Sequence, residues 1–252
     1  MPNDAGFAWR VVVCWISVFA LWELFRRAFP GAWPAAAARP AARRWLDLLL
    51  ALLVPAAILA LGQLWFAGVL RWQWPGAWRH LAYVLAQLVI WSPLALALVL
   101  RRQPLSSIWL PRDHAVLRGG AGAVLGLAAV ALYLGLCGTS ARWPAILART
   151  ATVEAWAHLV PVFLEACGVA FVYVRLRWAL GPVAAALVPG LLFAVAHLPR
   201  AFEAGDPVGA VVVMFVVNTA LVAGLVAWAA RFRDVVTLGV VHWLWDLAID
   251  AF

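Results

Sequence analysis

The sequence predicts an all-α integral membrane protein, a polytopic bundle of about eight transmembrane helices. The first observation is composition: 67% of the 252 residues are hydrophobic and 12% are charged, whereas a soluble domain has roughly 45–50% apolar and about 25% charged residues. The second is grouping, because the apolar residues form runs of about 20, the length that a helix needs to cross a bilayer. The third is the presence of seventeen Trp, whose indole rings favour the membrane–water interface.

Eight apolar segments account for the predicted helices. They are residues 9–28, 46–70, 80–100, 117–137, 152–175, 179–198, 209–230 and 235–252. The first carries Glu23 near its end, and the second, third and seventh are long runs of Leu, Ala and Val. The fourth begins at Gly119-Gly120 and is rich in Gly and Ala, which lets helices approach closely. The fifth contains two Glu and a His, the sixth ends in His197, and the eighth is short and follows a basic turn. The connections are too short for a soluble domain, so residues 1–252 form a single integral membrane domain.

The formal net charge of +8 does not indicate nucleic-acid binding. The basic residues, all of them Arg, are spread through the short connections and form no basic face that could follow a phosphate backbone. The connections after the first, third, fifth and seventh segments hold 13 Arg, and the opposite set holds 6. Because Arg-rich connections remain on the cytoplasmic side, we expect both termini outside the cytoplasm, with the chain in a bacterial inner (plasma) membrane.

Ionisable side chains inside the predicted helices are few and gather in the last hundred residues. A charged group at the centre of a bilayer helix costs roughly 2.5–3.5 kcal/mol on insertion scales, so each is a functional candidate. The polar residues are Glu154, His158, Glu165, His197, Asn218, His242, Asp246 and Asp250. Glu154, His158 and Glu165 lie at offsets of four and seven and share one helix face. We expect Glu154 and His158 near a membrane boundary and Asp250 in solvent. Asn218 either joins helices or supports a site.

Local spacing groups the strongest candidates. His242 and Asp246 are four residues apart, so they project from one face of the eighth segment. Phe193 lies one turn before His197 in the sixth segment. Two His and two acids, including Glu165, can perform two kinds of hydrolysis. They can hold a divalent metal that activates water, or the Glu can act as general base while a His and an acid stabilise the oxyanion.

These motifs resemble those of the CPBP family of intramembrane proteases, the CAAX-protease and bacteriocin-processing group that includes the Rce1-type prenyl-protein endopeptidases. The family pattern is EExxxR, then FxxxH, then HxxxN or HxxxD, on separate transmembrane helices. The run from Phe193 to His197 is similar to the second motif, and the run from His242 to Asp246 is similar to the third, including the basic turn before it. The resemblance implies eight spans, with variable N-terminal helices in 1–145 and the catalytic core in 150–252.

The first motif departs from the family pattern, because it contains one glutamate, Glu165, and no Arg. If Glu165 is the first acid of the pair, Ala166 replaces the second. If Glu165 is the second acid, Leu164 replaces the first, and the residues that follow the motif favour this reading. Adjacent helical residues point about 100° apart. In this reading, Glu165 can take the place of the missing first acid only through a rotation or a local bulge of the helix. Alternatively, Glu154 with His158 compensates for the missing acid.

The resemblance implies an intramembrane endopeptidase that acts on a membrane-anchored protein or peptide. Glu165 would activate water with the help of His197, while His242 and Asp246 would bind the oxyanion or orient the catalytic groups. The cofactor stays open between zinc, held by Glu165, His197 and His242, and no metal. Since the Arg distribution places His197 near the outer end of its helix, the expected substrates are exported or membrane-anchored bacterial proteins.

Two other functions stay open. The incomplete first motif fits a catalytically inactive membrane scaffold, immunity factor or partner protein, although the complete second and third motifs argue against it. A small transporter needs a broken-helix site or inverted repeats. The sequence shows neither, although Pro161 and Pro189 could interrupt the fifth and sixth helices. The oligomeric state follows from no pattern in the sequence.

Overall fold

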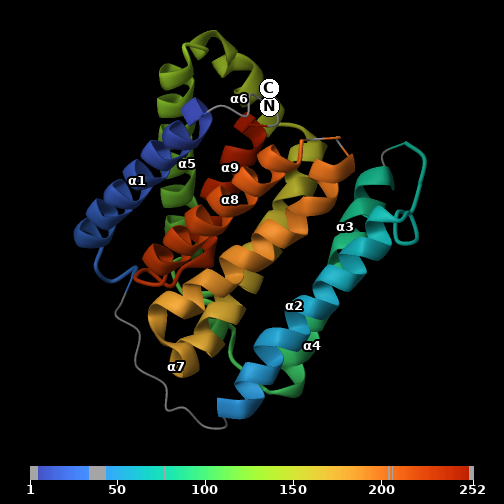
Figure 1. Ribbon diagram of the computed structural model, residues 1–252. Coiled ribbons are helices and arrows are strands. Elements are labelled where there is room, and N and C mark those ends of the chain that lie inside the picture. Colours follow the sequence, from blue (N-terminus) through green and yellow to red (C-terminus); the bar gives the residue numbers. More distant parts are fainter. Residues whose placement is uncertain (1–4, 34–43, 77, 204, 206, 250–252) are drawn as a thin grey trace.

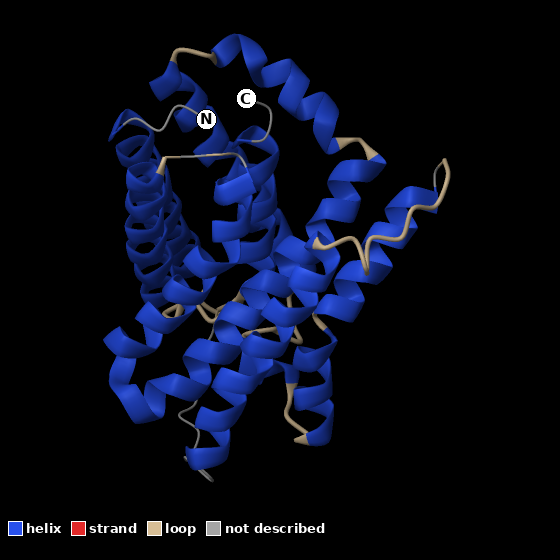
Figure 2. Cartoon of the chain, turned by 45° about the vertical axis from the view of Figure 1, so that its right-hand side comes forward, coloured by secondary structure: helices blue, strands red, loops and turns tan. Residues whose placement is uncertain are grey.

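The computed structural model describes residues 5–33, 44–76, 78–203, 205 and 207–249, and within them it contains helices and no strand. Figures 1 and 2 show these helices as a bundle. The helices are α1 (Ala5–Ala28), α2 (Arg44–Phe66), α3 (Trp78–Ile90), α4 (Ser92–Leu100), η1 (Leu105–Ile108), α5 (Ala115–Cys137), η2 (Ser140–Arg142), α6 (Trp143–Thr150), α7 (Val153–Glu203), α8 (Val208–Ala229) and α9 (Val235–Ile249). The predicted all-α polytopic bundle is confirmed, and each of the eight predicted segments overlaps one or more of these helices.

The longest helix, α7, is a hairpin of two limbs. Its 51 residues are interrupted at Gly181, where φ is 77° and ψ is 171°, a backbone region that is essentially restricted to glycine. Pro182 follows, and proline is well suited to the first turn of a new helix. We call residues 153–180 the first limb and residues 182–203 the second limb. They are the fifth and sixth predicted segments, and in Figure 1 the chain turns between them beside the α7 label.

The third and eighth predicted segments differ from simple spans. Residues 80–100 form α3 and α4, which meet at Trp91 with a bend of 48°, and a proline stands in the first turn of α4. The eighth segment is α9, of 15 residues, and Asp250 lies outside the described residues. By length and apolar composition, four of the described helices can cross a membrane. The number is five if the bent pair of α3 and α4 is one span. Both limbs of α7 are counted as one helix in these numbers.

The α7 hairpin lies at the centre of the fold, where it packs against α8, α9, α2 and α3. A second contact joins α5 to α9 through two glycines. A Cβ atom at Gly122 would lie 2.9 Å from the carbonyl oxygen of Thr237, and one at Gly126 would lie 2.7 Å from a methyl group of Leu244. The close approach predicted for the Gly-rich fourth segment is therefore present, and it places α9 beside α5.

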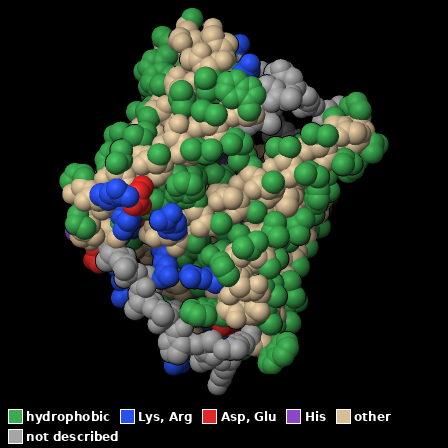
Figure 3. Space-filling view, turned by 60° about the vertical axis from the view of Figure 1, so that its left-hand side comes forward, with side chains coloured by type: hydrophobic (Ala, Val, Ile, Leu, Met, Phe, Trp, Pro, Cys, Tyr) green, Lys and Arg blue, Asp and Glu red, His purple; other side chains and the backbone are tan. Residues whose placement is uncertain are grey.

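The outer surface of the bundle suits a bilayer. Large apolar side chains are exposed along the helices, among them Trp45, Leu100 and Val116. Figure 3 shows hydrophobic side chains over most of one face, whereas most of the Arg side chains visible there lie in its lower left part. A surface of this kind is stable only against lipid, so the chain is an integral membrane protein.

Candidate active site

The α7 hairpin brings Glu165 and His197 to the same level of the bundle. Each lies sixteen residues from Gly181, one on either limb, and antiparallel limbs place residues equally distant from their turn side by side. Both residues line one cavity of about 140 Å³, which we call the inner cavity. Apolar residues of α2 and α7 and the ring of Trp91 form most of the remaining wall. The inner cavity is therefore an apolar chamber whose two ionisable lining residues come from opposite limbs of the hairpin.

The FxxxH spacing brings Phe193 and His197 into direct contact. The ring of Phe193 stacks on the ring of His197 with a centroid separation of 4.2 Å. The Nδ1 of His197 lies 2.8 Å from the carbonyl oxygen of Phe193, and when Nδ1 carries its proton it donates a hydrogen bond to that oxygen. This contact fixes the ring orientation and leaves Nε2 as the nitrogen that can accept a hydrogen bond in the neutral form.

Asp246 on α9 is shared between two histidines. The Nε2 of His242, one turn earlier on α9, lies 3.4 Å from its Oδ1. The Nε2 of His158, on the first limb of α7, lies 3.3 Å from its Oδ2. The predicted common face of His242 and Asp246 is therefore observed, and one carboxylate ties α9 to the first limb of α7.

Glu165 joins this group electrostatically. Its carboxylate lies close enough to His242, His197, Asp246 and His158 for their charges to interact with it. The structure thus brings the four main predicted residues together from both limbs of α7 and from α9. The single acid of the first motif lines the inner cavity together with His197.

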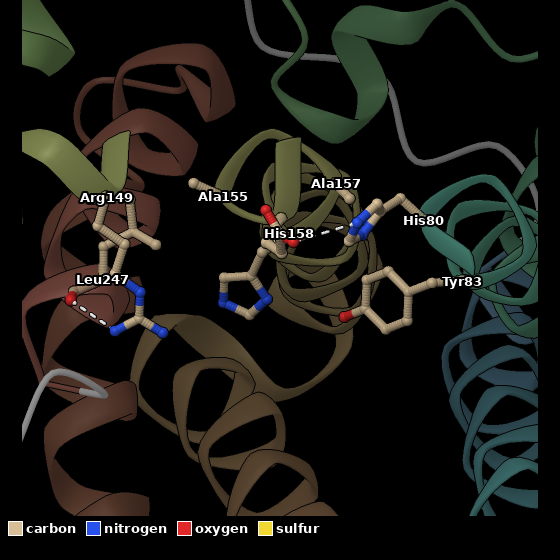
Figure 4. Close-up of a pocket in the computed structure, with 8 residues that line it drawn as sticks. His80, Tyr83, Arg149, Ala155, Ala157, His158 and Leu247 are labelled. Carbon is tan, nitrogen blue, oxygen red and sulfur yellow. Dashed lines mark hydrogen bonds and ion pairs between the residues drawn. The ribbon is translucent and has the colours of Figure 1, made fainter. Parts of the chain in front are cut away.

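The predicted supporting residues lie at different places in the structure. Glu154 is exposed and forms ion pairs with Arg79 (2.6 Å) and His80 (3.2 Å) of α3, so it does not replace the missing acid beside Glu165. Glu154 and His158 line a second cavity of about 280 Å³ with His80, Tyr83, Arg149, Ala155, Ala157 and Leu247, which we call the outer pocket (Figure 4). Asn218 lies within α8 and lines neither of these cavities.

A buried cluster around Asp234 was not predicted. The Oδ1 of Asp234 accepts hydrogen bonds from the backbone N–H groups of Val236 (2.9 Å) and Thr237 (3.2 Å), which makes Asp234 the N-cap of α9. Its Oδ2 accepts from the Nε1 of Trp33 (2.6 Å) and the hydroxyl of Thr237 (2.6 Å), and the guanidinium of Arg118 lies 3.3 Å away. Asp234 immediately precedes an apolar run, and this helix-start signal could have identified it.

The predicted zinc ligands Glu165, His197 and His242 are not gathered into a metal site in the described part of the chain. Within the described ranges, no three His, Cys, Asp or Glu side chains are placed so that they could hold one ion together. A structural or catalytic zinc site requires at least three protein ligands around one point.

Comparison with known proteins gives a match for one part of the chain. Residues 148–248 match the family model described as Rce1-like, type II CAAX prenyl endopeptidase. Neither the comparison with curated proteins nor the comparison with solved structures gave a match. The matched range contains both limbs of α7, α8 and nearly all of α9, and so includes Glu165, His197, His242 and Asp246. Residues 148–248 are therefore similar to an Rce1-like domain, in agreement with the resemblance to the CPBP family that the sequence motifs indicate.

Proposed function

We propose that the chain is an intramembrane endopeptidase that hydrolyses a peptide bond of a membrane-associated protein or peptide, with Glu165 as the general base. The observation that carries this proposal is that Glu165 and His197 line the same cavity inside the bundle, with His242 and Asp246 close enough to interact with Glu165. The apolar wall of the inner cavity suits an apolar segment of substrate.

The reaction needs a base for water and a donor for the oxyanion. Glu165 accepts one proton from water as the water oxygen bonds to the carbonyl carbon of the peptide, which gives a tetrahedral intermediate. Glu165 then passes this proton to the peptide nitrogen as the C–N bond breaks, which leaves an amine and a carboxylic acid. The Nε2 of His197 accepts a hydrogen bond from the attacking water, because its Nδ1 is held by the carbonyl oxygen of Phe193.

His242 is assigned to the oxyanion, and Asp246 is assigned to hold the His242 ring in position. The Nε2 of His242 faces Asp246, so its Nδ1 is the position from which a protonated ring can donate to the oxyanion. Removal of one such donor typically costs roughly 10²–10³ in kcat. We also propose that water is activated without a resident metal, and the absence of a suitable donor triad among the described residues supports this.

The substrates proposed are membrane-anchored or exported bacterial proteins. The outer pocket lies at the end of the bundle opposite Gly181, because Arg149, Glu154 and His158 belong to α6 and to the start of α7. The connections at the Gly181 end belong to the set with 13 Arg, and the other set holds 6. The rule that positive charges stay inside therefore favours a site that opens away from the cytoplasm of a bacterial inner membrane.

A catalytically inactive partner protein is the second candidate, and one observation favours it. The first motif has a single acid, and the nearest further acid on the same limb, Glu154, is engaged by Arg79 and His80 at the surface. An inactive member would keep the bundle and the apolar cavity but would not cleave.

Cleavage of quenched-fluorescent peptides with an apolar segment, by protein purified in detergent, tests the proposal. Glu165→Gln keeps the size of the side chain and removes the base, so we expect activity to fall by about 10²-fold or more. Glu23→Gln is the matched control, because Glu23 pairs with Arg26 and Arg27 on α1. Full activity of Glu165→Gln contradicts the proposal, and a wild-type protein that cleaves no peptide favours the inactive partner. Loss of activity on adding a chelator contradicts only the metal-free step.

A further inference from the structure

The inner cavity is small as well as apolar. Its volume is about 140 Å³, and an apolar cavity of roughly 150 Å³ has room for one benzene ring. Apart from Glu165 and His197, the lining consists of apolar side chains and one glycine, which come from α2, Trp91 and both limbs of α7. The chamber therefore has the size and the chemistry to hold one branched aliphatic or single-ring aromatic side chain.

The break between α3 and α4 sets the position of Trp91. Pro93 has no backbone N–H, so the carbonyl oxygen of Val89 cannot receive the hydrogen bond that residue 93 would donate in a continuous helix. The hydroxyl of Ser92 donates a hydrogen bond to that oxygen instead (2.8 Å). The two helices bend by 48° at this point, and Trp91, which lies at the bend, forms part of the wall of the inner cavity.

The Trp91 ring packs directly against the backbone of the first limb of α7 at Gly168. A Cβ atom at Gly168 would overlap the Cζ3 atom of Trp91 and would lie 3.1 Å from its Cη2 atom, so a larger residue would push the ring away. Gly168 and Glu165 are three residues apart, which places them on one face of the limb, and both line the inner cavity. Trp91 therefore closes the cavity about one helical turn from the proposed general base.

We propose that Trp91 is a specificity-determining residue, which limits the size of the substrate side chain admitted beside Glu165. The inference rests on the proposed hydrolysis and names its substrate class. This is a peptide with a branched aliphatic or single-ring aromatic side chain next to the bond that is cleaved. The indole ring suits this role because it is large and has few rotatable bonds, and because the contact with Gly168 holds it against the first limb.

A peptide series measures this size limit. Each peptide has an apolar segment of Ala residues that contains one varied residue, which is Ala, Leu, Phe or naphthylalanine. We expect cleavage beside the varied residue, identified by mass spectrometry of the products. The Leu and Phe peptides should have kcat/KM values about tenfold or more above the Ala peptide, which leaves the cavity unfilled, and above the naphthylalanine peptide, which is too large for it.

Variants of Trp91 test its role in the complete protein. Trp91→Ala enlarges the cavity and should raise kcat/KM for the naphthylalanine peptide about tenfold relative to the Phe peptide. Trp91→Phe keeps an aromatic ring of smaller size, so its ratio should lie between those of the wild type and Trp91→Ala. Trp78→Ala is the control, because it removes an exposed Trp at the start of α3, and it should keep the wild-type ratio.

Two outcomes overturn the role of Trp91. One is a wild-type ratio in Trp91→Ala. The other is an equal loss of kcat/KM on all four peptides, which indicates a packing role alone. If Trp91→Ala does not fold, the same two outcomes in Trp91→Phe overturn it.

Peptide binding separates this inference from the proposed hydrolysis. Fluorescence anisotropy of the labelled peptides with Glu165→Gln measures Kd without cleavage. The Kd values should show the same size preference, and the double variant Glu165→Gln/Trp91→Ala should shift it toward naphthylalanine. If this shift is seen and the wild type cleaves no peptide, only the proposed hydrolysis fails. If the wild type cleaves, Glu165→Gln does not, and the size preference is the same with and without Trp91, only this inference fails.

Discussion

At the scale of single residues, Asp234 has the most unusual position. It is 1% exposed, and a buried carboxylate is stable only when it is paired and fully hydrogen-bonded. Trp33, Arg118 and Thr237 satisfy one of its oxygens, and the first turn of α9 satisfies the other. Since α9 carries His242 and Asp246, this cluster fixes the start of the helix on which half of the candidate site is built.

Asp234→Ala should therefore destabilise the protein strongly. It removes the N-cap of α9 and leaves Arg118 buried beside no carboxylate, and loss of one partner of a buried pair costs about 3–5 kcal/mol. Thermal unfolding in detergent measures the change. Asp113→Ala, at an exposed loop position, is the control and should behave as the wild type. An Asp234→Ala protein as stable as this control would contradict the structural role.

Contacts within one helix were predictable from the sequence, and contacts between helices were less so. The pairs Phe193–His197 and His242–Asp246 follow from a spacing of four residues. The contact of His158 with Asp246 joins residues 88 apart in the chain. Glu154 shares a helix face with His158, yet it turns to α3 while His158 turns to α9. Periodicity defines a face, but the packing of neighbouring helices decides which partner each side chain meets.

At the scale of elements, turn residues decide where the predicted segments end. The fifth and sixth segments were predicted as separate spans, and Gly181 joins them with almost no connection because it adopts a backbone conformation that other residues avoid. The third segment was predicted as one helix, and it breaks at Trp91 before a proline. Hydropathy detects apolar length, and it does not register a bend inside an apolar run.

The contact between α5 and α9 gives an element-scale prediction. Gly122→Val should push the two helices apart, because the new Cβ would lie 2.8 Å from the Cβ of Val240 and 2.9 Å from the backbone oxygen of Thr237. Overpacking of this kind costs about 1–3 kcal/mol. Activity should fall as well, since α9 moves with His242. Gly119→Val is matched in helix and in substitution, and nothing lies within 4 Å of its Cβ position. Equal stability of the two variants, measured by thermal unfolding in detergent, would contradict the close contact.

At the scale of the whole molecule, a chain that crosses the membrane an even number of times has both ends on the same side. The placement of α1 and α9 fits the even number of predicted segments. The beginning of α1 and the end of α9 lie at the same end of the bundle in Figures 1 and 2. The α7 turn at Gly181 lies at the opposite end in Figure 1, with the Arg-rich set of connections. The outer pocket belongs to the end with fewer Arg. The charge asymmetry therefore bears directly on which compartment supplies the substrate.

Cysteine labelling in spheroplasts decides the orientation. The background protein has Cys14, Cys137 and Cys167 replaced by Ala. One variant changes the exposed residue Ala141, between α5 and α6, to Cys. The matched variant, Asp113→Cys, carries its Cys at the other end of the bundle. A membrane-impermeant maleimide should label Ala141→Cys in intact spheroplasts and Asp113→Cys only after permeabilisation, because the Arg-rich end stays in the cytoplasm. The reverse pattern would place the outer pocket on the cytoplasmic side. Substrates would then have to reach Glu165 from within the cell, and the proposal of exported substrates would be wrong while the hydrolytic chemistry would be unaffected.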